Sequence, residues 1–78
     1  MKSIFVQVKC ELGRAYEVAG AAAEIEQVSE VYSTSGEYDL LLKCYIGDTD
    51  DAGRFVCETV QRMDGVRDTY TLITFKAF

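Results

Sequence analysis

The chain has 78 residues, a formal net charge of −5 at pH 7, three cysteines and no histidine. This length allows one small domain, and the acidic balance offers no basic face for phosphates, which disfavours direct nucleic-acid binding. The lack of histidine removes the usual zinc spacings and the Ser-His and Cys-His pairs, and no Gly-rich phosphate-binding motif occurs. We therefore expect one domain over residues 1–78, with no metal site, no cofactor and no catalytic residues.

The three cysteines, Cys10, Cys44 and Cys57, form no CxxC pair and cannot all be bridged within the chain. Cys10 and Cys44 lie in apolar strand patterns, which favours small buried side chains over a disulfide framework. Free thiols fit a reducing compartment. The apolar stretch after Met1 is too short to span a membrane and lacks the cleavage region of a signal peptide, so we expect a cytoplasmic protein.

The first half of the chain has the pattern of a strand, a helix and a strand. Residues 3–10 alternate apolar and other side chains with the period of a strand. From Arg14 to Gln27 the period is helical. Residues 28–35 are β-branched and aromatic and stop at Gly36, which predicts the second strand. Small apolar side chains form one face of the helix: Ala15, Val18, Ala19, Ala22 and Ile25.

The second half repeats the pattern as strand, helix and strand. Residues 39–46 form an apolar strand, joined to the preceding one by a short turn with Gly36, as a hairpin requires. We expect the second helix to begin after an N-cap at Asp48 or Thr49, and residues 66–78 return to a strand pattern. The buried face of this helix repeats at i, i+3 and i+4: Ala52, Phe55, Val56, Thr59, Val60 and Met63.

This order of elements predicts the ferredoxin-like βαββαβ architecture of the α+β class. Two split βαβ units build one antiparallel four-stranded sheet, and both helices pack on the same face. The right-handed rule for βαβ crossovers leaves few alternatives.

Such a sheet should be polar on the face that carries no helix, yet large apolar groups occur in both parities of its strands. A patch of that size exceeds what a soluble monomer tolerates, so we expect a second copy to cover it about a two-fold axis. The alternative is an ordinary monomer with scattered apolar surface residues. The residues that we expect at the dimer interface are Phe5, Leu41 and Tyr45.

Two segments, "TSGEYDLLLKC" and "MDGVRDTYTLITF", resemble the C-terminal effector domain, or RAM domain, of the Lrp/AsnC family of transcriptional regulators. The shared features are a Gly-Glu-Tyr-Asp turn before a leucine-rich strand, a helix of matching length, and Gly65-Val66 followed by Thr69 and Thr71. The resemblance covers essentially the whole chain.

The resemblance implies a non-enzymatic module that binds a small molecule, typically an amino acid, where dimers meet. It also implies sheet-to-sheet homodimers of the dimeric α/β-barrel type, assembled into an octamer or another ring. Family regulators carry an N-terminal helix-turn-helix, whereas this chain starts at the first effector-domain strand. It therefore resembles the stand-alone members, and a link to transcription would run through full-length Lrp/AsnC regulators.

An amino acid needs an anion for its ammonium group, which Asp39 or Glu37 could supply, and donors for its carboxylate, such as threonine hydroxyls or backbone N–H groups. Alternatively, Gly36 serves only the turn, Asp39 caps it, and the threonines are strand formers. By resemblance, the ligand-binding residues are Gly36, Glu37, Tyr38, Asp39, Thr69, Thr71 and Leu72.

Two other functions stay open. One is a small ferredoxin-like enzyme of the dimeric barrel type, in which an aspartate or a tyrosine would replace the missing histidine. The other is an amino-acid-sensing module like the ACT domain, which shares the strand order; here Gly13 is the one glycine in the first strand-to-helix loop.

Overall fold

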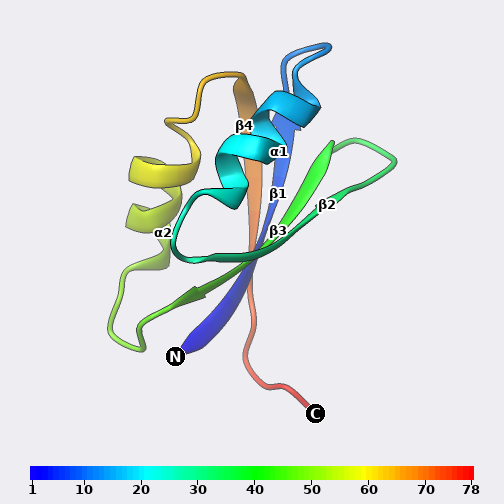
Figure 1. The fold of residues 1–78 in the computed structure, drawn as a ribbon. Helices are drawn as coiled ribbons and strands as arrows, with labels where there is room; N and C mark the ends of the chain where they lie inside the picture. Colours follow the sequence, from blue (N-terminus) through cyan, green and yellow to red (C-terminus); the bar gives the residue numbers. More distant parts are fainter.

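The computed structural model describes residues 1–78 and has the ferredoxin-like βαββαβ order that the sequence predicts (Figure 1). The strands form one antiparallel sheet in the order β2-β3-β1-β4, and both helices lie on one side of it. The elements are β1 (Lys2–Cys10), α1 (Ala15–Ala23), β2 (Val28–Ser33), β3 (Leu40–Ile46), α2 (Ala52–Phe55), the π-helical turn η1 (Val56–Val60) that continues α2, and β4 (Val66–Ile73).

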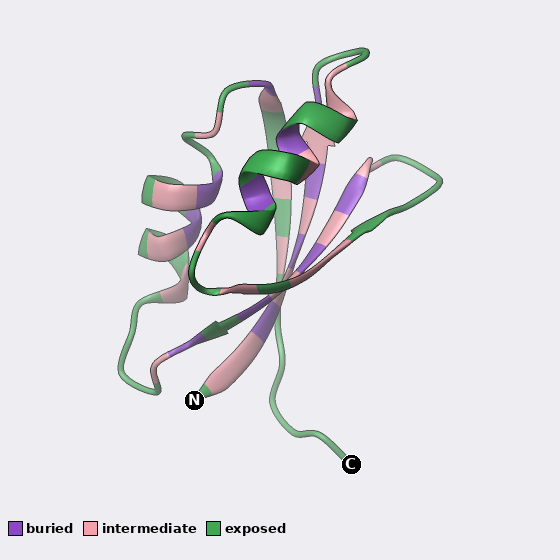
Figure 2. Cartoon of the chain, in the orientation of Figure 1, coloured by how far each residue is buried: buried purple, intermediate pink, exposed green.

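The core lies between the helices and the two central strands, β1 and β3. In both strands every second residue is buried, which is the pattern expected where one face of a sheet is covered (Figure 2). Cys10 and Cys44 are buried as small hydrophobic side chains, as predicted, and Cys57 is exposed. The buried apolar residues are Ile4, Val6, Val8, Cys10, Val18, Ala22, Leu40, Leu42, Cys44, Ile46, Val56 and Val60.

Helix α1 packs its small side chains on the sheet, with Val18 and Ala22 fully buried. It ends at Ala23, earlier than the predicted end at Gln27. The backbone N–H groups of Glu24 and Ile25 each donate to the carbonyl three residues back, at 3.1 Å. These bonds tighten the last turn and let the chain enter β2 directly.

Helix α2 begins at a different cap from the predicted Asp48 or Thr49. The N-cap is Asp51, whose Oδ1 accepts the backbone N–H of Arg54 at 3.0 Å. Asp48 instead pairs with the N-terminal ammonium group at 3.0 Å. After Phe55 the helix widens into η1, where Val56 and Val60 are buried.

Two strands are shorter than predicted: β2 ends at Ser33, and β4 ends at Ile73 instead of running to Phe78. The antiparallel register explains the second difference, because Ile73 lies opposite Ile4 and the N-terminus then offers few residues for pairing. Phe75 and Phe78 are fully exposed on a tail that leaves the sheet (Figure 1).

None of the helices combines the length and the apolar character that crossing a membrane requires.

The end of the sheet where β4 begins is held to the loop before α1. The backbone N–H of Glu11 donates to the carbonyl of Gly65 at 2.8 Å, and Arg14 pairs with Asp64 at 2.8 Å. Arg14 thereby holds the pKa of Asp64 below its usual value. Gly65 is buried in the left-handed region, with φ of +95°.

Replacing Gly65 with alanine should destabilise the fold. A Cβ there would lie 2.9 Å from the Cγ2 of Val18, and the left-handed backbone adds about 1–2 kcal/mol of strain for a non-glycine residue. Gly20→Ala is the matched control: it lies within α1 with open space around its Cα, and should raise the free energy of unfolding by about 0.5–1 kcal/mol. Urea unfolding measures both, and equal midpoints for the two variants would contradict the expectation.

Candidate functional site

The hairpin turn (residues 34–39) joins β2 to β3 and lies where β1 ends and β4 begins. Although the turn belongs to the β2–β3 hairpin, it is attached to β1. The backbone N–H of Asp39 donates to the carbonyl of Val8 at 2.9 Å, and the backbone N–H of Cys10 donates to the Oδ2 of Asp39 at 2.7 Å. The turn is therefore held to the middle of the sheet.

Asp39 makes both of the hydrogen bonds that attach the turn to β1. Besides its bonds to β1, its carbonyl accepts the backbone N–H of Thr34 at 2.9 Å and so closes the turn. Burial raises the pKa of the Cys10 thiol, and the nearby charge of Asp39 raises it further. The second carboxylate oxygen of Asp39, Oδ1, makes no hydrogen bond within the chain. Asp39 thus has a structural role and still presents one free oxygen.

Of the other turn residues, Gly36 and Glu37 are exposed, and Tyr38 is half-buried like Asp39. Gly36 has φ of +100°, and an added Cβ would meet nothing within 4 Å, so the backbone angle is what requires glycine. The carbonyl of Glu37 accepts the Nζ of Lys9 at 3.0 Å. Partial loss of water raises the pKa of Tyr38, and the carboxylates of Asp68 and Glu37 raise it further.

The three predicted ligand residues of β4 point to opposite sides of the sheet. Thr69 lies opposite the buried Val8 and Thr71 opposite the buried Val6, which places both threonines on the helix-covered face. The Oγ1 of Thr69 accepts a hydrogen bond from the Nε2 of Gln61, after η1, at 2.7 Å. Leu72 has the other parity and is exposed on the opposite face.

The seven predicted ligand residues therefore form no single pocket within one chain. Four lie in the hairpin turn, two lie on the helix side of the edge strand β4, and one lies on its other side. The structure also brings to the turn residues that the sequence analysis missed, namely Lys9, Asp68 and Tyr70. Once β1 and β4 are paired, their register places Lys9 opposite Asp68, but no motif marks either residue.

The open face is the side of the sheet that carries no helix. Phe5 and Leu41 are half-buried there, and Tyr45 is exposed, so the three predicted dimer-interface residues share one surface. By strand register, the open face consists of Ser3, Phe5, Gln7, Lys9, Glu30, Tyr32, Leu41, Lys43, Tyr45, Asp68, Tyr70 and Leu72.

The charges of the open face balance. Lys43 pairs with Glu30 at 3.5 Å, and Lys9 lies opposite Asp68. The whole chain carries a net charge of −5, so the excess negative charge lies on the other surfaces.

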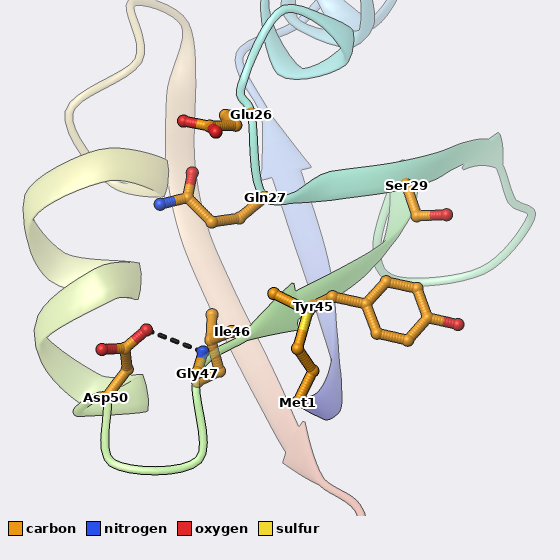
Figure 3. Close-up of a pocket in the computed structure, with 8 residues that line it drawn as sticks. All are labelled: Met1, Glu26, Gln27, Ser29, Tyr45, Ile46, Gly47 and Asp50. Atoms are coloured by element: carbon orange, nitrogen blue, oxygen red, sulfur yellow. Dashed lines mark hydrogen bonds between the residues drawn. The ribbon is translucent and has the colours of Figure 1, made fainter.

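A hollow of about 440 Å³ lies at the other end of the sheet from the hairpin turn (Figure 3). Of its two acidic residues, Glu26 and Asp50, the latter is already hydrogen-bonded within the chain, since its Oδ2 accepts the backbone N–H of Gly47 at 2.7 Å. None of the seven predicted ligand residues lines it. The residues that do are Met1, Glu26, Gln27, Ser29, Tyr45, Ile46, Gly47 and Asp50.

A second hollow, of about 430 Å³, lies on the open face beside the C-terminal tail. It is lined by Phe5, Lys43 and Tyr45 from the sheet and by Lys76 and neighbouring residues of the tail. Two of the three predicted interface residues therefore border a recess that a protein surface could fill.

Comparison with known proteins matches residues 3–78 to the family described as the Lrp/AsnC ligand binding domain. The HTH-type transcriptional regulator FL11 of Pyrococcus horikoshii is 32% identical over 72 residues, which are 92% of this chain and 47% of that regulator. The matched part of the chain spans about half, or less than half, of the length of these curated relatives.

Solved structures show the same fold. TTHA0845 from Thermus thermophilus is 33% identical, with a TM-score of 0.91 over 100% of this chain and 98% of that one. The transcriptional regulator NMB0573 from Neisseria meningitidis, solved as a complex with L-Met, is 25% identical, with a TM-score of 0.81 over 96% of this chain and 50% of that one.

Replacing Asp39 with alanine should lower the free energy of unfolding by about 1–3 kcal/mol, because the part-buried N–H of Cys10 would lose its acceptor. Asp39→Asn keeps an oxygen in that place and should lose less. Glu37→Ala is the control, since that exposed side chain makes no hydrogen bond, and it should be close to neutral. Urea unfolding of the three variants checks the order, and an alanine variant as stable as the control would refute the structural role of Asp39.

Proposed function

The chain belongs to the Lrp/AsnC ligand-binding-domain family, and we propose from this that it is a non-enzymatic module that binds a free amino acid between its own subunits. Transcriptional regulation would be its setting, since the relatives it matches are transcriptional regulators. The observation that carries the proposal is the hairpin turn, which offers carboxylate oxygens beside β4 in a site that one chain leaves incomplete.

The chemistry of the turn suits an amino acid. The free Oδ1 of Asp39 and the exposed carboxylate of Glu37 can accept from an ammonium group. The ligand carboxylate would take donors from threonine hydroxyls or from free backbone N–H groups of a neighbouring copy. The L-Met complex of the Neisseria meningitidis relative supports an amino acid as the ligand class.

A second copy of this chain is the partner that best fits the open face. Half of the residues of this face are aromatic or leucine, and its four charged residues, Lys9, Lys43, Glu30 and Asp68, carry no net charge. Two such faces can meet without the repulsion that the other acidic surfaces would cause. Burying the exposed apolar area would drive the pairing.

Larger assembly follows from this arrangement. The ligand residues on the helix side of β4 and in the turn stay outside the paired faces, so dimers would meet there and close a ring, an octamer in our proposal. Full-length Lrp/AsnC regulators could join the ring through the same interfaces. We place the protein in the cytoplasm, where its three thiols would stay free.

Titration with each proteinogenic amino acid, followed by calorimetry, should identify at least one that binds. Asp39→Asn should weaken that binding about tenfold or more, because it removes the charge that faces the ammonium group while keeping the bond to Cys10. Glu26→Gln is the control, since Glu26 lines the hollow at the far end of the sheet, and it should bind like the wild type. The absence of heat with every amino acid would refute the ligand class, and unchanged affinity in Asp39→Asn would exclude Asp39.

Replacing Leu41 with lysine should convert the paired chain into a monomer, because Leu41 is central on the open face and two added charges would be buried in each pair. Leu12→Lys is the control, since Leu12 is 96% exposed on the loop before α1 and should leave the assembly unchanged. Sedimentation velocity over a range of concentrations measures both. A wild-type chain that sediments as a monomer throughout would refute the pairing.

A further inference from the structure

The hairpin turn is connected to the open face through Tyr38. The turn joins β2 to β3, and β1 lies between β3 and β4. The ring of Tyr38 nevertheless lies 6.3 Å from the ring of Tyr70 on β4, at an interplanar angle of 36°. Tyr38 therefore reaches past β1 to the edge strand. Tyr70 belongs to the open face, where it lies opposite Gln7 and is 53% exposed.

Lys9 makes a second connection of the same kind. It lies on the open face opposite Asp68, and its Nζ donates to the backbone carbonyl of Glu37 at 3.0 Å. Asp39 holds the root of the turn from within the sheet, whereas Lys9 and Tyr70 hold its outer part. The outer part accepts two side-chain hydrogen bonds in all: the one from Lys9, and one from the Thr34 hydroxyl to the Tyr38 carbonyl.

We propose that Lys9 and Tyr70 are positioning residues that couple pairing of the open faces to the conformation of the hairpin turn. The coupling rests on the proposed function, because it assumes that a second copy covers the open face. It adds a way in which that pairing prepares the amino-acid site, although Lys9 and Tyr70 need not touch the ligand.

The coupling has a physical cause. In one copy alone, Tyr70 is 53% exposed, so Tyr38 packs against a ring that only one side of the protein confines. When a second copy covers Tyr70, the ring is confined on its other side too, and the contact with Tyr38 becomes drier and stronger. The turn is then ordered before the ligand arrives, so ligand binding loses less conformational entropy. By linkage, the ligand favours pairing to the same degree.

Amide hydrogen exchange tests the coupling without any ligand, so its outcome is independent of whether an amino acid binds. In the wild type, exchange at Glu37 and Tyr38 should slow as the concentration is raised from monomer to dimer. Tyr70→Leu keeps an apolar group on the open face but removes the ring, and its paired form should exchange about fivefold faster at these amides than the paired wild type. Lys9→Met should act in the same direction.

Tyr45→Leu is the matched control. Tyr45 lies on the same open face towards the far end of β3, so its loss should weaken pairing while leaving exchange of the turn in the paired form like that of the wild type. Wild-type exchange at the turn in paired Tyr70→Leu would overturn the proposal, as would a wild-type turn whose exchange does not change with pairing. A chain that never pairs would instead overturn the dimer on which the proposal rests, and sedimentation of the same samples separates these outcomes.

Discussion

Two short helices can cover only one face of a four-stranded sheet, and this constraint governs most of the structure. On the covered face the alternation of β1 and β3 is almost fully satisfied, with Ile4, Val6 and Val8 completely buried. On the open face the same alternation leaves Phe5 and Leu41 half-buried, with tyrosines around them. The covered face stabilises the domain, and the open face is the surface on which we propose that a second copy packs.

In the hairpin turn, Asp39 has a structural role and is also the residue that we propose faces the ligand. The carboxylate of Asp39 uses one oxygen to accept the N–H at the end of β1 and leaves the other free. A site built on such a residue is rigid at its root, which suits a sensor because the anion is already in place before the ligand arrives. Asp39→Ala would remove both the bond that holds the turn and the charge that faces the ligand, so a loss of binding could have either cause. Asp39→Asn keeps the bond and removes only the charge.

The order of elements and the buried positions could be predicted because they depend on periodicity, which is local. The boundaries depended on contacts that periodicity does not contain. Asp51 is the cap of α2 because the preceding residues first form a turn, in which Gly47 and Asp50 are bonded to each other. β4 cannot run to Phe78, because only Met1, Lys2 and Ser3 lie beyond Ile4, the partner of Ile73. The resemblance supplied the candidate ligand residues, and strand alternation alone puts Thr69 and Leu72 on opposite sides of the sheet. Only the register showed that the threonines lie on the helix-covered side.

The two termini lie at the same end of the sheet, away from the hairpin turn (Figure 1). A domain joined at either terminus would therefore lie at the opposite end of the strands from the hairpin turn, where we propose that the ligand binds. With about 3.3 Å of rise per strand residue, the seven residues of β3 span most of that separation. The hairpin turn and the point of attachment would then lie at opposite ends of one rigid sheet. A change at the turn would therefore reach an attached domain by rotating whole sheets relative to one another.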